Sequence, residues 1–409
     1  MPDPTSLTAT SVPDPTSLTA TGVRDRVTAF LANHDHRQLD RLAFLQARFD
    51  AGLAWVHFPV GLGGLGAPRA LQEVVQAAFT AAGAPDNNPR RIGIGLGMAA
   101  PTILRHGTDE QRRQYLRPLW TGAEVWCQLF SEPGAGSDLA GLGTRAVKTG
   151  DEWIVNGQKV WTSMAHEADR AILVTRTDPD VPKHQGMTYF VLDMHATGVE
   201  VRPLRQITGE AEFNEVFLTD VAIPDSDRLG DVGDGWKVAQ TTLMNERVSI
   251  GGGIQPREFG MIGALTEVWR ERPEVRTPAA RDAVMQLWVQ AEAARLGGIR
   301  LVQSLAAGQP GPEGSASKLV FAKLMQQISG LELELVGEDG LRHDEWTMRR
   351  NTTVDFFARS AVHRYLRAKG NSIEGGSSEI LRNIIAERVL GLPSEPRIDK
   401  DVAWKDLPR

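Results

Sequence analysis

The sequence predicts a mainly α-helical protein with a central β domain, because helical and β-type patterns occupy separate stretches of the chain. Apolar residues recur at three- and four-residue steps from about residue 23 to 119, and again from residue 233 onward. Between these stretches, short runs rich in β-branched and aromatic residues alternate with turn residues. We therefore expect an N-terminal helical domain at 23–119, a compact middle β domain at 120–232 and a C-terminal helical bundle at 233–395.

Individual elements follow from the same patterns. In the first helical region, residues 71–82 and 99–106 are periodic. Gly93-Ile-Gly-Leu-Gly97 imitates a dinucleotide fingerprint, but no strand clearly precedes it and no acidic residue follows at a suitable spacing, so we interpret it as a helix-packing or loop segment. The predicted strands are 171–177, 187–192, 199–204, 213–218 and 221–224. The later predicted helices are 283–307, 315–336, 360–369 and 378–390.

Both ends of the sequence are expected to lie outside these domains. Residues 2–10 form a nonapeptide rich in Pro, Thr and Ser that recurs unchanged as residues 13–21. Two such copies are too few for a packed repeat architecture, and they contain little that a core could bury. We therefore expect residues 1–22 to be a disordered tail and residues 396–409 to be a C-terminal tail.

Composition excludes several classes of protein. The chain has 409 residues, 41% of them hydrophobic, and a net charge of −6, whereas nucleic-acid binders usually carry a basic face. No run of 18 apolar residues predicts a membrane helix, and the first 23 residues lack the apolar region of a secretory signal. A single cysteine, Cys127, precludes an internal disulfide, fits a cytoplasmic location and is expected to be a small buried residue. The histidines lack metal-ligand spacing, so no metal site is expected.

The most informative stretch runs from Trp126 to Ser163. Residues 130–138 read F-S-E-P-G-A-G-S-D, and residues 156–163 read N-G-Q-K-V-W-T-S. A short strand is predicted at 153–155, and the Asn156-Gly157 pair is a hairpin signal. Small residues would let a large planar ligand approach the backbone, hydroxyls would satisfy its polar edge, and Trp161 would cover its face.

This pair of segments resembles the flavin-binding segment of the acyl-CoA dehydrogenases. A second stretch, residues 373–388, is similar to the C-terminal signature of the same family. The resemblance covers nearly the whole chain after residue 22. It implies a β-barrel-like middle domain, a C-terminal four-helix bundle and FAD as the cofactor. By the same resemblance, the cofactor-binding residues are Gln128, Phe130, Ser131, Gly136, Ser137, Trp161, Thr162, Ser163, Ser377 and Glu379.

The register of the C-terminal signature decides where the resemblance puts the catalytic base. Many family members carry this glutamate immediately before a Gly-Thr pair, and the ungapped match puts Gly375 at that position. Glu374 falls one residue earlier and is kept as an alternative base. Isovaleryl-CoA-type members instead carry the base on an earlier helix, just before an arginine. Glu246 and Arg247 have that arrangement here, so Glu246 is the expected base.

The resemblance implies α,β-dehydrogenation of an acyl-CoA thioester. Glu246 would remove the α-proton, the β-hydrogen would leave as hydride, and the backbone N–H of Gly375 would stabilise the developing enolate oxygen. Ser137, Arg247 and Glu374 are the expected substrate-binding residues. Electrons would pass to an electron-transfer flavoprotein. Two alternatives stay open: a flavin oxidase or monooxygenase on the same fold, and a non-catalytic partner subunit of a mixed oligomer.

Two departures from the family pattern bear on assembly. The Arg-x-x-Phe-Gly segment, which in relatives contacts a neighbour's FAD, has only a displaced counterpart at Arg257-Glu-Phe-Gly260. The family's Gly-Gly-x-Gly appears as Gly337-Glu-Asp-Gly340, with two carboxylates that disfavour a nearby pyrophosphate. We therefore expect either a homo-oligomer, a dimer or the tetramer usual in the family, or a hetero-oligomer with a related subunit.

Overall fold

The computed structural model describes residues 18–251, 255–306, 313–343, 345–353, 359–397 and 399–408, and only the backbone at 247–251, 305, 306 and 313. Contacts along the chain divide it into two compact units. The first combines the chain up to Asn88 with Arg112–Ala123, and the second combines Pro89–Gln111 with the chain from Glu124 onward. Each unit is described by itself. The domain ranges expected from the sequence stay a prediction.

The first unit is a small helical assembly around an aromatic core. It contains α1 (Ala20–Asn33), α2 (Arg41–Asp50), α3 (Gln72–Ala81) and most of α6 (Asp109–Thr121). Phe30, Phe44 and Phe79 meet edge to face at its centre. The helix α1 begins at Ala20, inside the range 1–22 expected as a tail, because Thr19 caps it by accepting a hydrogen bond from the Gly22 N–H. The rest of that tail, residues 1–17, lies outside the described residues.

The second unit contains the remaining elements. Its strands are β1 (Trp126–Leu129), β2 (Arg145–Thr149), β3 (Glu152–Ser163), β4 (Arg170–Arg176), β5 (Met187–Asp193), β6 (Val199–Pro203), β7 (Phe213–Pro224) and β8 (Arg228–Leu229). Its helices are α4 (Pro89–Ile94), α5 (Ala100–His106), α7 (Gly235–Gly251), α8 (Met261–Glu271), α9 (Pro278–Ala306), α10 (Glu313–Val336), α11 (Ala361–Ala368) and α12 (Ser378–Ile384). Helix, strand and helix regions therefore follow one another as predicted, and the predicted fold class is confirmed.

The strands form one mixed eight-stranded sheet within the described residues. Its order is β6-β7-β3-β2-β4-β5-β8, and β1 pairs in parallel with β4. One face packs as a continuous core in which Cys127, Trp153 and Phe190 are fully or almost fully buried. Alternation along β3 supplies this core, since Trp153 and Val155 point inward while their neighbours are more exposed. The buried position expected for Cys127 is confirmed.

The hairpin interpretation of Asn156-Gly157 is wrong. Both residues lie inside the continuous strand β3, at a break in its register with β7, and the β2–β3 hairpin turns earlier, between Thr149 and Glu152. Gly157 is needed for close approach, because a Cβ there would come within 2.3 Å of the Thr144 Oγ1. The Asn156 side chain exchanges two hydrogen bonds with Asp220 across this irregularity. Asn and Gly thus mark a β-bulge rather than a turn.

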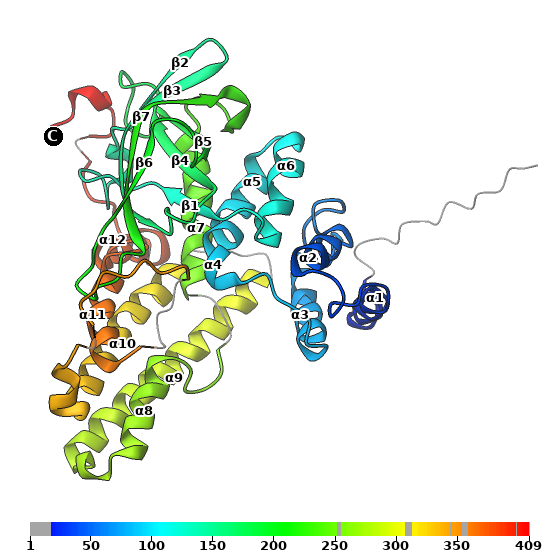
Figure 1. Cartoon of the computed structure of the whole chain (residues 1–409). Coiled ribbons are helices and arrows are strands. Elements are labelled where there is room, and N and C mark those ends of the chain that lie inside the picture. The colour runs from blue at the N-terminus through cyan, green and yellow to red at the C-terminus, as the bar shows by residue number, and fades with distance from the viewer. Residues whose placement is uncertain are drawn as a thin grey trace, which may run out of the picture. The chain divides into compact units, whose positions relative to one another are not determined.

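The later helices pack around α10. This helix contacts α7, α8, α9, α11 and α12, and Figure 1 shows α8, α9 and α10 running side by side. Leu265, Leu287 and Ile328 form part of their shared apolar core. The segment around Gly93 continues α4 into a π-helical turn at Gly95–Ala99, consistent with a helix-packing segment and not with a strand-borne dinucleotide loop. Over the described residues, no helix has the length and apolar character needed to cross a bilayer.

Candidate functional site

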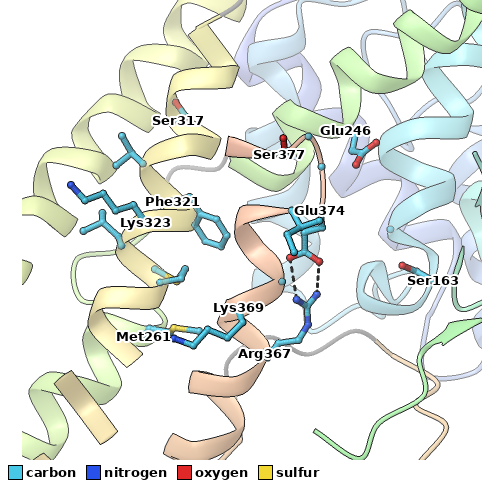
Figure 2. Close-up of a pocket in the computed structure, with 18 of the residues that line it drawn as sticks. Ser163, Glu246, Met261, Ser317, Phe321, Lys323, Arg367, Lys369, Glu374 and Ser377 are labelled. Atoms are coloured by element: carbon cyan, nitrogen blue, oxygen red, sulfur yellow. Dashed lines mark hydrogen bonds and ion pairs between the residues drawn. The ribbon is translucent and has the colours of Figure 1, made fainter. Parts of the chain in front are cut away.

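A large cavity of about 2110 Å³ opens within the second unit, between the sheet and the helices of the bundle. Figure 2 shows part of its wall, with side chains from α7, α10, α11 and the turn before α12. Most of the residues that the sequence singled out line this one cavity. They are Gln128, Phe130, Ser131, Gly136, Ser137, Trp161, Ser163, Glu246, Glu374, Gly375 and Ser377. Gln128 and Ser377, which are 249 positions apart in the chain, are therefore brought to a single space.

A buried ion pair joins the two halves of the Trp126–Ser163 stretch. The Lys159 ammonium donates to the Glu132 carboxylate at 2.8 Å and to the carbonyls of Phe130 and Val174. Glu132 also accepts from the N–H groups of Gly143 and Thr144. Burial raises the Glu132 pKa, but Lys159 and these donors outweigh it and hold the pKa below its usual value. Glu132 and Lys159 thus fix the loop, and neither lines the cavity.

Beside this pair, the strand turns its side chains toward the cavity. Trp161 has a φ of 61°, at a register shift between β3 and β7. Its indole is 57% exposed and meets Phe213 edge to face. Thr162 is buried, and its Oγ1 has no hydrogen-bond partner among the described residues. The exposed indole of Trp161 suits a planar ligand, whereas Thr162 does not line the cavity.

Glu246 projects from α7 toward the first strand. The Gln128 Nε2 lies 3.3 Å from the Glu246 Oε2, and both side chains line the cavity. The Gln128 Oε1 is buried and has no partner among the described residues. Gln128 therefore holds the carboxylate from one side and leaves one buried acceptor for a donor supplied by a ligand.

Helix α7 is anchored one turn before Glu246. The Thr242 hydroxyl lies 2.9 Å from the Tyr189 hydroxyl of β5 and 2.9 Å from the Thr102 hydroxyl of α5. All three side chains are fully buried. Burial raises the pKa of Tyr189, so its hydroxyl stays protonated. These hydrogen-bonded hydroxyls fix the position of α7 along its axis and its rotation about that axis, and so the position of Glu246.

Glu374, the alternative base, is ion-paired. The Arg367 Nη1 and Nη2 donate to its two carboxylate oxygens at 3.1 and 2.9 Å. Arg367 is almost fully buried, and its Nε also lies 3.6 Å from the Glu212 Oε1. Figure 2 shows the Glu374 carboxylate directed at Arg367, whereas Glu246 projects from a different helix. Both oxygens of Glu374 are thus engaged by one bidentate cation.

The turn that carries Gly375 is held by a buried lysine. Gly375 and Gly376 both have positive φ, 62° and 94°, which favours glycine at these positions. The Lys318 Nζ donates to the carbonyls of Asn371 and Gly376 at 2.8 and 2.7 Å, spanning the turn from both sides. Burial lowers the Lys318 pKa, against the opposing effect of Glu374 and Glu246. Ser377 then caps α12 by accepting from the Ile380 N–H.

Three predicted site residues lie elsewhere or are not described. Thr162 is buried behind the cavity wall. Glu379 is exposed on α12 and pairs with Arg382 at 3.3 Å, so the structure does not bring it to the cavity. The side chain of Arg247 lies outside the described residues. Their assigned roles stay predictions.

The cationic character of the cavity wall is not predicted by the sequence. Among the described lining residues, Arg and Lys outnumber Glu, although the whole chain carries a net negative charge. The cations come from separate elements: Arg90, Arg91, Arg205, Arg257, Arg295, Lys323, Arg367, Lys369 and Arg388. Arg257 and Arg295 are paired with Glu292, so part of this charge is already neutralised. A wall of this kind suits a ligand with phosphate groups.

The residues present fit FAD. The indole of Trp161 stands exposed beside the cavity, the buried Gln128 Oε1 lacks a partner among the described residues, and cations line the same wall. These features would satisfy, in turn, a flat ring system, its polar edge and a pyrophosphate. Among the described residues, no group of three or more potential ligand side chains could hold a metal ion.

Three family models together match almost the whole described chain. They are the N-terminal domain of acyl-CoA dehydrogenase over residues 19–123, the middle domain over 127–221 and the C-terminal domain over 233–390. The middle-domain match contains the Trp161 segment, and the C-terminal match contains Glu246 and Gly375.

Two relatives from Mycobacterium tuberculosis have similar sequences. Acyl-CoA dehydrogenase IpdE1 is 36% identical over 363 residues, which cover 88% of this chain and 89% of the relative. Acyl-CoA dehydrogenase FadE34 is 39% identical over 347 residues, 84% of this chain. This chain spans only 45% of the length of FadE34.

Two solved structures share the fold. The Tcur3481-Tcur3483 steroid ACAD superposes with a TM-score of 0.70 at 25% identity, covering 92% of this chain and 98% of the other. A chain of the ChsE4-ChsE5 complex from Mycobacterium tuberculosis superposes with a TM-score of 0.68 at 27% identity, covering 93% of this chain and 99% of the other.

Proposed function

We propose a function from the premise that this chain belongs to the acyl-CoA dehydrogenase family of FAD-dependent oxidoreductases, which act on CH–CH bonds. The proposed reaction is the oxidation of an acyl-CoA thioester to its α,β-unsaturated product. The observation that carries it is the meeting of Glu246, the Gly375 turn and the exposed Trp161 face in one cavity. Proton removal, carbonyl polarisation and flavin binding all need groups at such a place.

The proposed roles follow from these positions. Glu246 takes the α-proton of the thioester, and the Gln128 amide holds the carboxylate in place. The Gly375 N–H donates to the thioester carbonyl oxygen, on which negative charge develops. Bound FAD would accept the β-hydrogen as hydride, so that a double bond forms between Cα and Cβ. Gln128, Trp161 and Ser163 line the cavity on the side proposed for the flavin.

The pairing of Glu374 supports Glu246 as the base. Both carboxylate oxygens of Glu374 accept hydrogen bonds from Arg367, so the carboxylate is directed at that guanidinium. Instead, the pair fixes the turn from which the Gly375 N–H is proposed to donate. The proposed role of Glu374 in substrate binding is therefore indirect: it holds the turn that presents the Gly375 N–H.

The proposed substrate is a bulky, ring-containing acyl-CoA. The cavity is lined near α4 by Gly93, Ile94 and Met98, and a Cβ on Gly93 would meet nothing within 4 Å. The adjoining turn, Gly95–Ala99, is π-helical. A related structure is described as a steroid ACAD, which supports the same substrate class for this chain.

We further propose an electron-transfer flavoprotein as the electron acceptor and assembly with a second, related subunit or with further copies of this chain. The ChsE4-ChsE5 complex is a relative that contains two different subunits, and the departures at Arg257 and Gly337 fit such an arrangement. An oxidase would instead pass electrons to oxygen.

Anaerobic mixing with a panel of acyl-CoAs tests the function. Flavin absorbance should bleach fastest with ring-containing thioesters, and Glu246→Gln should slow bleaching by about 10²–10⁴-fold while retaining FAD. Reoxidation should be fast with a dye acceptor and slow in air. Fast reoxidation in air would identify an oxidase, and a flavin that no thioester reduces, with or without a partner subunit, would refute the proposed reaction.

A further inference from the structure

The segment Asp399–Pro408 returns to the β domain and packs beside the loop that carries Ser137. Its backbone pairs with the β4–β5 connection: the Trp404 N–H donates to the Val181 carbonyl at 2.9 Å, and the Lys405 N–H donates to the Pro179 carbonyl at 3.0 Å. Lys405 adds an ion pair with Asp180 at 2.6 Å. A segment expected as a tail is therefore docked in a defined register.

Trp404 connects this segment to the loop. Its Nε1 donates to the Gly141 carbonyl at 3.1 Å. Its ring edge would lie 3.7 Å from a Cβ on Gly143, and the Arg176 guanidinium lies 5.0 Å from the ring centroid. Arg176 is buried and in turn donates to the carbonyls of Ala140 and Lys183. The indole thus covers the back of residues 140–143, with a cation–π contact on one side.

A charged bridge makes a second connection. The Lys183 ammonium lies 2.5 Å from the Asp399 carboxylate and 2.8 Å from that of Asp138. Lys183 is almost fully buried, and although burial lowers its pKa, the two carboxylates raise it above its usual value. One lysine therefore ties Asp399 to the residue that follows Ser137.

The braced loop forms part of the cavity wall. Gly136, Ser137 and Leu139 line the cavity on its inner side. At the far end of the loop, the N–H groups of Gly143 and Thr144 donate to Glu132, the partner of Lys159. The docked segment therefore contacts the outer side of a loop whose inner side faces the proposed ligands.

We propose that the segment Asp399–Pro408 is a brace that positions Ser137 and its loop for the acyl-CoA arm of the substrate. Asp399 and Trp404 act through the loop and touch neither substrate nor cofactor, so they are positioning residues. The substrate part of this proposal rests on the proposed function, whereas the bracing itself does not.

Three single substitutions in the full-length chain test the brace. Asp399→Asn removes the negative charge that pairs with Lys183, and Trp404→Ala removes the hydrogen bond to the Gly141 carbonyl. Lys405→Gln is the matched control, because it breaks an exposed ion pair of the same segment that does not reach the loop. Hydrogen–deuterium exchange over residues 133–143, FAD content and steady-state kinetics are the measurements.

We expect faster exchange at 133–143 in both brace variants and a KM for acyl-CoA raised roughly three- to tenfold, the effect of losing about one hydrogen bond. The kcat should stay within about twofold and FAD content should be unchanged, since the Glu132–Lys159 pair is intact. Lys405→Gln should match the wild type.

Unchanged exchange in both brace variants, or equal changes in all three, would overturn the brace. Faster exchange with an unaltered KM would overturn its role in substrate positioning. If the wild type oxidises no acyl-CoA, the proposed function fails, but the exchange experiment still decides whether the segment braces the loop.

Discussion

Arg367 on α11 holds both carboxylate oxygens of Glu374, at 3.1 and 2.9 Å. Glu246 and Glu374 are the two candidates for the catalytic base in this cavity, and the ion pair with Arg367 distinguishes Glu374 from Glu246. Glu374 serves to fix the turn before α12, together with Lys318 from α10. Glu246 instead lies on α7, where the Gln128 amide donates to its Oε2 at 3.3 Å.

Glu246→Gln should lower the rate of flavin reduction by acyl-CoA by about 10²–10⁴-fold, the usual contribution of a positioned general base. Gln keeps the shape of the side chain and removes only its basicity, so FAD and substrate should still bind. Stopped-flow absorbance under anaerobic conditions measures the rate, and titration with substrate measures binding.

Glu374→Gln is the matched control on the other side of the cavity. It should lose far less activity than Glu246→Gln, and the loss should come with reduced thermal stability, because Arg367 is left buried with a weaker partner. An inactive Glu374→Gln beside a normal Glu246→Gln would move the base into the C-terminal signature. If neither substitution changes the activity measured for the wild type, the chain is better described as a partner subunit or as a flavin enzyme of other chemistry.

The most reliable predictions from the sequence concern features formed by residues that are close together in the chain. Ser131, Gly136 and Ser137 belong to one loop, so their common location followed from the motif itself. Gly157 was misinterpreted because a turn and a bulge both select Asn-Gly, and only the approach of Thr144 distinguishes them.

Other features of the site depend on contacts between distant segments. The pairing of Arg367 with Glu212 joins residues more than 150 positions apart, and no pattern in the sequence around either residue predicts it. The docking of Trp404 on Gly141 is of the same kind, since the segment around Trp404 is polar and carries no periodicity. Such contacts are decided by tertiary packing, which a single sequence does not display.

Cys127 should resist alkylation in the folded protein. It is fully buried in the core of the sheet, and burial raises the pKa of its thiol, so the reactive thiolate is scarce at neutral pH. Incubation with iodoacetamide followed by mass spectrometry should show less than one label per chain without denaturant and one label after unfolding. Rapid labelling of the native protein would show that this part of the sheet opens.

Two truncations should separate the repeated segment from α1. Deleting residues 2–17 should leave the melting temperature unchanged, because the Pro/Thr/Ser repeat offers little apolar surface to bury. Deleting residues 2–23 should lower it, because Thr19 caps α1 and Val23 is fully buried. Together these losses amount to about 2–4 kcal/mol of unfolding free energy. Equal melting temperatures would contradict the packing of α1.

The Glu132–Lys159 pair should make stability depend on pH in acid. The pKa of Glu132 is lower in the folded state than its ordinary value of 4.5, so the pair stabilises the fold above that value. This contribution is lost as the pH falls through the folded-state pKa. Burial lowers the pKa of Lys159, so burying its charged form costs stability. This cost is relieved only as the pH rises toward 10.5, the ordinary pKa of lysine.

Glu132→Gln should therefore destabilise the protein at pH 7 by about 3–5 kcal/mol, because it leaves Lys159 buried without a counter-charge. Below about pH 4.5 the difference from the wild type should shrink, because the wild-type glutamate is then progressively protonated as well. Urea unfolding at pH 7, 5 and 3.5 measures both effects. In a double-mutant cycle, Glu132→Gln with Lys159→Met should cost less than the sum of the single changes. A constant difference across this pH range, or full additivity, would mean that the two charges do not stabilise each other, and that the loop before Ser137 is held by its backbone hydrogen bonds alone.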